Sequence, residues 1–214
     1  MIETIINDIN YRLDEDNLTA EVIRRKGVEY EGNIIIPETT VFNDVTYRVT
    51  SIGEHAFTNC SSLTSIVIPD SVTKIEAGTF KFCRRLTSIV IPDSVTIIGR
   101  YAFENCTSLT SIVIPNTVTH IGEGAFSDCA KLERVIVREG VTDIAIKAFY
   151  HSSALVDMSL PASLTSIGED AFAYTAIKKI TFGGSIREWK QMNTKKSGSE
   201  ITVVCANGST SSYR

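Results

Sequence analysis

The sequence has no broad excess of basic residues. Its 21 lysines and arginines are set against 25 aspartates and glutamates, which gives a formal net charge of -4 and an isoelectric point near 5.5. Attraction to phosphate groups dominates the affinity of proteins for nucleic acids. The charge balance therefore argues against DNA or RNA as a partner.

Long hydrophobic runs are also missing. No apolar stretch approaches the ~20 residues that are needed to span a bilayer. The opening MIETIINDINYR has no basic segment followed by an apolar one, as a secretory signal would have. We therefore expect either a cytoplasmic protein or an export signal that lies outside this chain.

Signatures of enzymes are equally scarce. No G-x-S-x-G nucleophile elbow occurs, and the Gly-Gly-Ser sequence near the C-terminus is not a phosphate-binding loop. His55, His120 and His151 fall at unequal places on turns or outward faces, so we do not expect them to converge with an acid and a nucleophile. The sequence predicts a protein that is not an enzyme and that needs no cofactor.

The sequence instead contains one segment that is repeated several times. LTSIVIPDSVTKI begins at Leu63, close copies begin at Leu86 and Leu109, and more divergent blocks begin at Leu132 and Leu155. The shared pattern is L-x-x-I-x-I-P-x-x-V-x-x-I-G-x-x-A-F-x-x-C, whose first apolar residues alternate with period two, as in a strand with one buried face. Blocks of 23 residues that stack on one another predict a solenoid.

These blocks resemble the repeat of the BspA-like leucine-rich repeat family. The likeness rests on LTSIVIPDSVTIIGRYAFENCTS and its copies and covers about residues 33–182, while INYRLDEDNLTAEVIRRKGVEYEGNIIIP resembles the family's amino-terminal cap. The resemblance implies a bacterial surface or secreted protein that adheres to proteins of a host or of neighbouring cells. The asparagine of the general leucine-rich repeat is absent, so we do not expect a standard asparagine ladder. Its place is taken by Ser71, Ser94, Thr117 and Gly140.

We predict a mostly β leucine-rich-repeat solenoid that forms one structural domain. Residues 1–32 should form a hairpin cap over the open end of the first coil, residues 33–182 the solenoid, and residues 183–214 a C-terminal cap and tail. In that tail we expect a short amphipathic helix over Ile186 and Trp189, a polar linker NTKKSGSE and a strand ITVVC. Trp189 is expected to seal the final coil.

Cysteine recurs at one place in four consecutive blocks, at Cys60, Cys83, Cys106 and Cys129. Zinc needs ligands that converge from paired short spacings, whereas an interval of 23 stacks the thiols in a column about 5 Å apart. We predict a packed ladder of buried cysteines. Disulfides between neighbouring coils stay an alternative, and so does either state of Cys205, which lies outside the repeats.

Two further columns have structural explanations. The turn after each strand carries Asp70, Asp93, Asn116 and Glu139. Carboxylates in a column can hold calcium, but aspartate and asparagine are also common turn residues, so we predict no metal site. The glycine of the recurring Ile-Gly pair is expected to permit a backbone turn that a Cβ would hinder.

The outward side of the strands, which we call the strand face, is the candidate binding surface. Leu63, Ile66 and Ile68 should point into the core, and the residues between them should point out. One outward ladder carries Ser65, Ser88, Ser111, Arg134, Asp157 and Lys179, and the other carries Val67, Val90, Val113, Ile136, Ser159 and Thr181. We call the Val67, Val90, Val113 and Ile136 column the stripe. Contiguous exposed apolar residues often mark partner sites, although β-branched residues are also simply favoured in strands.

The function predicted from the sequence is therefore binding of a protein partner by the strand face of a monomer. One alternative is a structural spacer or a self-assembling scaffold. Another is a carbohydrate-binding module, which would need several exposed aromatic residues on one face, and the ladders have none.

Overall fold

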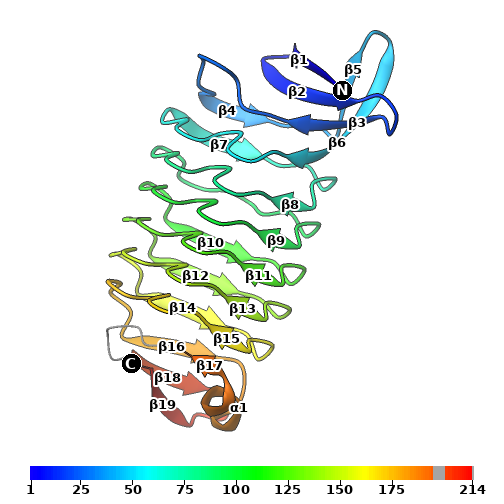
Figure 1. The fold of residues 1–214 in the computed structure, drawn as a ribbon. Helices are drawn as coiled ribbons and strands as arrows, with labels where there is room; N and C mark the ends of the chain where they lie inside the picture. Colours follow the sequence, from blue (N-terminus) through cyan, green and yellow to red (C-terminus); the bar gives the residue numbers. More distant parts are fainter. Residues whose placement is uncertain (195–200, 214) are drawn as a thin grey trace.

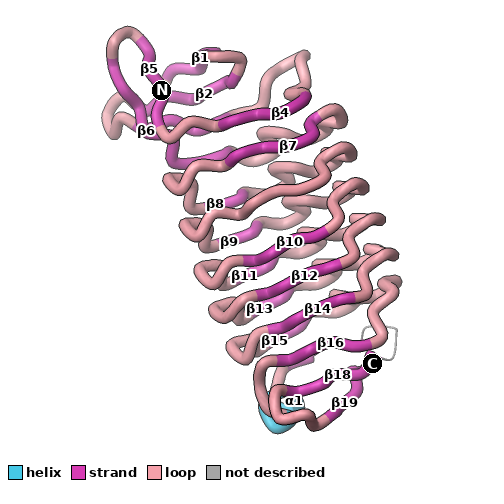
Figure 2. The backbone as a smooth tube through the Cα atoms, turned by 180° about the vertical axis from the view of Figure 1, so that it is seen from behind, coloured by secondary structure: helices cyan, strands magenta, loops and turns pink. Residues whose placement is uncertain are grey.

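The chain winds into a solenoid whose coils stack along one axis (Figure 1). The computed structural model describes residues 1–194 and 201–213. Most coils contribute one longer and one shorter strand, and the two kinds of strand lie on opposite sides of a shared hydrophobic core (Figure 2). The predicted mostly β leucine-rich-repeat solenoid is confirmed.

The long-strand side carries the predicted strand face. Its strands are β4 (Gly32–Ile35), β7 (Leu63–Val67), β10 (Ser111–Ile114), β12 (Arg134–Val137), β14 (Asp157–Leu160), β16 (Lys179–Phe182), β18 (Ile201–Cys205) and β19 (Thr210–Tyr213). β4 and β7 form a two-stranded sheet, and β10 to β19 form a six-stranded one. Parallel pairing places Ser111 beside Arg134, 23 positions later, so equivalent residues of successive coils are neighbours.

The opposite side is one continuous sheet, which we call the short-strand sheet. Its strands are β1 (Ile2–Ile6), β2 (Ile9–Asp14), β3 (Thr19–Val22), β6 (Val45–Ile52), β8 (Lys74–Ile75), β9 (Ile97–Ile98), β11 (His120–Ile121), β13 (Asp143–Ile144), β15 (Ser166–Ile167) and β17 (Asn193–Thr194), with β5 (Thr39–Phe42) paired to β6. The isoleucine that precedes the recurring glycine, such as Ile75, Ile98 and Ile121, thus lies in a short strand of each repeat.

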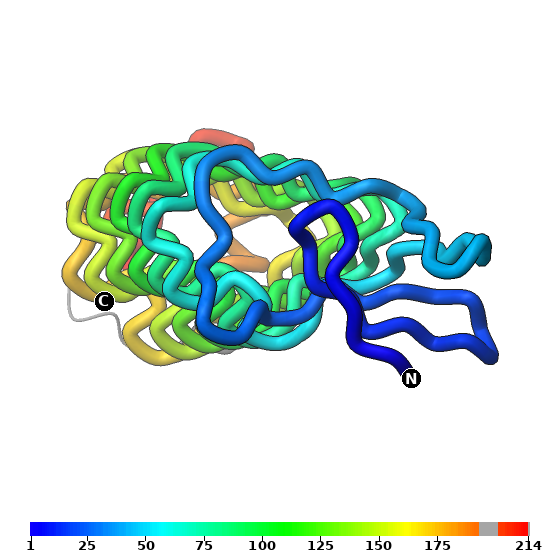
Figure 3. The backbone as a smooth tube through the Cα atoms, turned by 90° about the horizontal axis from the view of Figure 1, so that it is seen from above, coloured from blue at the N-terminus to red at the C-terminus, as the bar shows by residue number. Residues whose placement is uncertain are grey.

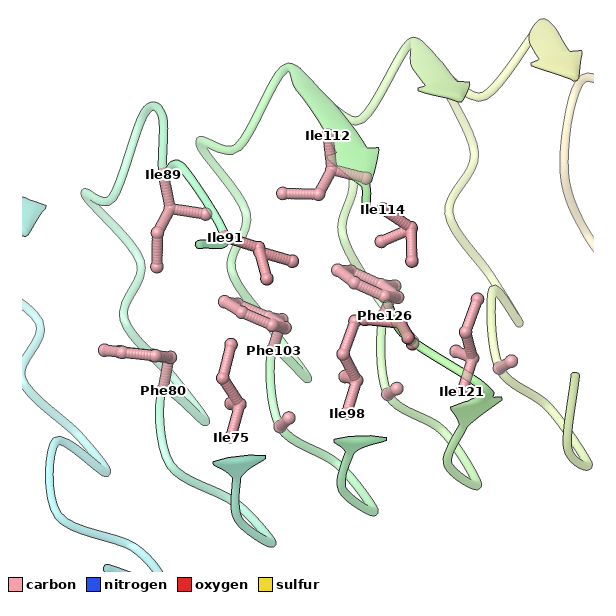
Figure 4. Close-up of a cluster of buried hydrophobic side chains, with 14 of the residues drawn as sticks. Ile75, Phe80, Ile89, Ile91, Ile98, Phe103, Ile112, Ile114, Ile121 and Phe126 are labelled. Carbon is pink, nitrogen blue, oxygen red and sulfur yellow. The ribbon is translucent and has the colours of Figure 1, made fainter. Parts of the chain in front are cut away.

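A column of phenylalanines fills the space between the two sides. It consists of Phe57, Phe80, Phe103, Phe126, Phe149 and Phe172, whose successive ring centroids are 5.4, 5.3, 5.0, 5.2 and 5.9 Å apart. Figure 4 shows three of these rings in a row between isoleucines of the long-strand side and of the short-strand sheet. Offset stacking of this kind stabilises each pair beyond the burial of its area.

The cysteines form the predicted ladder beside the phenylalanines. All five cysteines of the described residues are unpaired and buried. The Cys83 thiol donates a hydrogen bond to the Phe57 carbonyl at 3.2 Å, and Cys129 does the same to Phe103 at 3.1 Å. Burial raises the pKa of Cys60 to about 11, because the charged thiolate is disfavoured away from water. The disulfide alternative does not hold in this structure.

At two of the four positions where asparagine is absent, a hydroxyl group bonds to the preceding coil, whereas Ser71 Oγ is buried without a hydrogen-bond partner among the described residues. Ser94 Oγ donates to the Val72 carbonyl at 2.6 Å, and Thr117 Oγ1 donates to the Val95 carbonyl at 2.7 Å. Each side chain therefore satisfies a backbone acceptor of the preceding coil, which is the task that an asparagine amide would otherwise perform.

The glycine of the Ile-Gly pair serves a different purpose from the predicted one. A Cβ on Gly122 would lie 2.6 Å from the carbonyl carbon of Gly99 in the preceding coil, so the coils approach too closely there for a side chain. The left-handed turns fall on other residues, among them Tyr101 (φ 55°) and Asn105 (φ 59°). Close stacking, and not turn geometry, favours glycine at Gly122.

The N-terminal cap extends only the short-strand sheet. The predicted hairpin is present as β2 and β3, and β1, which was not predicted, pairs with β2. β3 then pairs in parallel with β6. Seen along the axis, the cap strands lie to one side of the first coil (Figure 3).

The C-terminal cap contains the predicted helix and strand. α1 (Ile186–Gln191) begins at a capping box of Ser185 and Glu188, and the Trp189 ring packs 5.3 Å from Phe182 and 6.0 Å from Tyr213. The sequence missed β19, which pairs antiparallel with β18. The predicted linker NTKKSGSE lies outside the described residues apart from its first two positions, which belong to β17.

No helix in the described part of the chain is long and apolar enough to cross a membrane.

Candidate functional site

The stripe is exposed along the long-strand side. Strand alternation buries the residues on either side of each member, as Ile112 and Ile114 flank Val113. Val67 is 54% exposed and Val90 is 80% exposed, and Val113 and Ile136 are also exposed. Because Val113 lies directly beside Ile136 in the parallel ladder, the column is continuous at that point.

Ile35 lengthens the stripe by one coil and was missed from the sequence. It pairs with Val67 in the β4–β7 ladder, and its side chain is 69% exposed. The signal was available, since NIIIP matches the recurring SIVIP and places this isoleucine at the stripe position.

The polar ladder beside the stripe has two different halves. Asn33 Oδ1 accepts hydrogen bonds from Thr64 Oγ1 and Ser65 Oγ, both at 2.8 Å, so Ser65 is partly engaged within the chain. Ser88 and Ser111 are exposed to solvent. The first half of this ladder therefore offers small hydroxyl groups to a partner.

Within the two outward ladders, the charged residues all lie in the second half, from Arg134 onward. The Arg134 Nε atom lies 2.9 Å from Asp157 Oδ2, and both side chains are more than half exposed. An exposed pair of this kind contributes little to stability, about 0–1 kcal/mol. Lys179 and Thr181 are exposed in the next coil, and Ser159 is half-buried.

A shallow groove of about 360 Å³ opens on the strand face between Val90 and Val113. Its lining includes Ser88, Asp93, Ser111 and Arg138. The groove is the place where the stripe is hollowed, with a carboxylate and a guanidinium at its rim.

The backbone ladder is interrupted beside this groove. Residues 88–91 form no strand, although LTSIVIP is identical in the coils before and after. The backbone hydrogen bonds next to this segment are long. Thr87 N–H donates to the Thr64 carbonyl and Thr110 N–H donates to the Thr87 carbonyl, each at 3.4 Å. Val90, the most exposed member of the stripe, lies in this interrupted coil.

One histidine does meet an acid and a hydroxyl, contrary to the prediction. The His120 Nδ1 atom lies 2.6 Å from Asp143 Oδ2, and Ser166 Oγ donates to Asp143 Oδ1. The parallel register of β11, β13 and β15 brings them together. The carboxylate lies between the other two groups, so the imidazole cannot take the serine proton, as activation of a nucleophile requires.

The described residues offer no cluster of metal ligands. Groups of three or more histidine, cysteine, aspartate or glutamate side chains that could hold a metal do not occur there. In the turn column, Glu139 accepts hydrogen bonds from the backbone N–H of Ala162 at 3.0 Å and of Ser163 at 3.1 Å. The Glu139 carboxylate therefore satisfies backbone N–H groups of the turn in the next coil.

An aromatic cluster that was not predicted from the sequence lies on the turns that contain Tyr150, His151 and Tyr174. The rings of Tyr150 and Tyr174 meet edge to face with centroids 5.2 Å apart, and His151 lies 6.0 Å from each of them. His151 and Tyr174 both have left-handed backbone (φ 59°), which is uncommon for residues of this size. The exposed aromatic residues lie away from the strand face.

The chain matches a known repeat family and several solved structures. The family model described as BspA type Leucine rich repeat region matches residues 38–87 and 73–197, in six copies. A leucine rich cell surface protein from Faecalibacterium prausnitzii has 32% sequence identity and a TM-score of 0.74, and the match covers 100% of this chain and 61% of that protein. This chain therefore spans less than two thirds of that relative. A comparison with curated proteins found no match.

Two further structures show the same fold. The pneumococcal vaccine antigen PcpA has 21% identity and a TM-score of 0.69, with 98% of this chain and 53% of that one covered. A leucine-rich repeat protein from T. pallidum has 25% identity and a TM-score of 0.55, with 89% and 91% covered.

Proposed function

The chain belongs to the BspA type leucine-rich repeat family, and on this basis we propose that it is a non-enzymatic module that binds a protein partner with its strand face. The observation that carries the proposal is the exposed stripe, lengthened by Ile35. Contiguous exposed apolar residues often mark the site where a partner binds.

The composition of the strand face fits the usual anatomy of a protein interface. Interface energy concentrates in a desolvated apolar centre, and a polar rim excludes water around it. Here Val90 and Val113 border the groove of about 360 Å³, with Asp93 and Arg138 at its rim. We propose that this part of the stripe is the centre of the contact.

The charged end of the strand face would select the partner. Arg134, Asp157 and Lys179 are exposed, and charges at a rim influence association rate and specificity more than affinity. A partner that fits should carry complementary charges on one side of an apolar patch.

We also propose a location on the bacterial cell surface and a role in adhesion to proteins of a host or of neighbouring cells. The support is the relative from Faecalibacterium prausnitzii, which is described as a cell surface protein.

A capture experiment with three forms of the chain tests the binding face. The wild type, a Val90→Lys/Val113→Lys double variant and an Ile97→Lys/Ile146→Lys double variant would be immobilised and exposed to surface proteins of host and neighbouring cells. Ile97 and Ile146 are also exposed β-branched residues but lie off the strand face, so the control carries the same change in charge. Circular dichroism would verify that all three forms are folded.

The proposal expects a protein that binds the wild type and the control variant and binds the strand-face variant at least tenfold more weakly. Equal binding of one partner by all three forms would remove the strand face as the contact. The absence of any captured protein would contradict the binding function.

A further inference from the structure

The first strand of the long-strand side has one free edge. β4 pairs with β7 only, whereas β12, β14, β16 and β18 each have a strand on both sides. The Gly32 N–H donates to the Ser62 carbonyl at 3.0 Å and the Ile36 N–H donates to the Val67 carbonyl at 3.1 Å. Since alternate residues of a strand direct their backbone groups to opposite sides, the N–H and C=O groups of Asn33 and Ile35 face the free edge.

The N-terminal cap does not cover this edge. The cap strands continue the short-strand sheet through the pairing of β3 with β6. Figures 2 and 3 show β4 at the start of its stack, with the cap strands set to the other side of the coil. Natural proteins usually protect a free edge with a bulge, a proline, an inward charge or a covering segment. The pairing of β4 with β7 is irregular between Gly32 and Asn33, but within the described residues no strand covers the outer side of β4.

The side chains around the edge combine apolar surface with negative charge. Ile35 is 69% exposed and Val28 is 51% exposed. Glu29, Glu31 and Glu38 lie within three residues of the strand ends and are exposed. None of the three acids has an ion pair in the described part of the chain.

The basic residues of this end line two grooves. Arg24 and Lys26 line a groove of about 790 Å³ together with Glu3, Glu21 and Glu54. Arg24 and Arg25 also line a groove of about 250 Å³ together with Val28 and Glu29, so Glu29 has basic neighbours. The acids that flank β4 directly are Glu31 and Glu38. A twofold pairing of β4 with β4 of a second copy would bring Glu31 and Glu38 of both chains together, which is unfavourable.

We propose that the free edge of β4 binds an extended, basic segment of a partner protein, which adds to the sheet as one more strand. Main-chain hydrogen bonds to Asn33 and Ile35 provide the affinity, and the flanking glutamates select lysine or arginine at the ends of the segment. This site is separate from the groove at Val90 and Val113, and it goes beyond the binding function proposed for the strand face.

A labelled octapeptide, Lys-Thr-Ile-Thr-Val-Thr-Ile-Lys, is a direct probe of the site. Its binding to the full chain would be followed by fluorescence anisotropy. Two derivatives carry N-methyl groups on alternate amides, one on the first, third and fifth, the other on the second, fourth and sixth. A strand added to one edge uses only alternate amides. The proposal therefore expects one methylated peptide to bind at least tenfold more weakly and the other to bind like the parent.

The role of charge in peptide binding is tested with variants of the peptide and of the protein. A peptide with glutamate in place of both lysines should bind at least tenfold more weakly, and so should the parent peptide to a Glu31→Lys chain. A Glu169→Lys chain changes an exposed acid far along the sequence and should bind normally. The Val90→Lys/Val113→Lys chain should also bind normally, which separates this site from the strand face.

Three results would overturn the proposal. They are no saturable binding of the parent peptide, equal binding of both methylated peptides, and concentration-dependent dimers in sedimentation that exclude the peptide. The last result would assign the edge to a second copy of the chain.

Discussion

Replacing Phe103 by alanine should remove a central contact of the phenylalanine column. The ring is fully buried and stacks on Phe80 at 5.3 Å and on Phe126 at 5.0 Å. Replacing a buried phenylalanine by alanine typically lowers the free energy of unfolding by roughly 3–5 kcal/mol. Because the two neighbouring rings each lose a stacking partner, we expect a loss of about 4–5 kcal/mol, at the upper end of that range.

The assay is equilibrium unfolding in urea, followed by two probes. Far-ultraviolet circular dichroism reports on all coils, whereas fluorescence of Trp189, the single tryptophan, reports on the C-terminal cap. Repeat proteins are stabilised through contacts between neighbouring coils. If the column couples these coils, the midpoints of both signals should fall together, although Trp189 is far from Phe103 along the chain.

A Phe103→Leu variant is the matched control. Leucine keeps most of the apolar volume, so it should lower the unfolding free energy by roughly 1–2 kcal/mol. A loss below about 2 kcal/mol for the alanine variant, or a loss equal to that of the leucine variant, would refute the argument that the stacked ring is central to stability.

Three further predictions concern the ladder, the tail and the interrupted coil. The four repeat cysteines should resist a thiol reagent at about pH 8 until the protein unfolds. Rapid labelling of the native protein would contradict this burial. Because burial raises the pKa of Cys60 from 9.0 to about 11, the free energy of unfolding, measured in urea, should be constant below pH 9 and should fall as the pH rises toward 11. Ending the chain at Phe182 removes Trp189 from that ring and should cause aggregation or a large fall in melting temperature, whereas an unchanged melting temperature would show that the tail is an appendage. Amides of residues 88–91 should exchange with deuterium faster than those of residues 111–114, since their ladder is interrupted; equal rates would show that the ladder is closed in solution.

The repeat determined most of the architecture from the sequence alone. When one 23-residue block is copied, successive coils can stack only with equivalent residues beside each other, so the period predicts the register as well as the strand. This is why the burial of Leu63 and Ile66, the exposure of Val67 and the column of cysteines could all be predicted. Binding by the strand face stays a prediction, because exposure alone does not identify a partner.

The ends of the solenoid were less predictable, because the pattern that carried the information stops there. The sequence indicated the β2–β3 hairpin and the helix at Trp189, but not β1 or β19. A strand at the end of a sheet is decided by which edge is free when the coils have formed, and that choice depends on residues far apart in the chain.

Only the tertiary structure decided the remaining features. Identical LTSIVIP segments form strands at β7 and β10 but not in the coil between them, so the neighbours of a segment, and not its own residues, set whether its ladder closes. His120 meets Asp143 only because two separate coils stack in register. The free edge of β4 likewise follows from the path of the cap along the opposite sheet. These features depend on the distance between coils and on the direction in which the ends turn, and a local pattern of apolar and polar residues encodes neither.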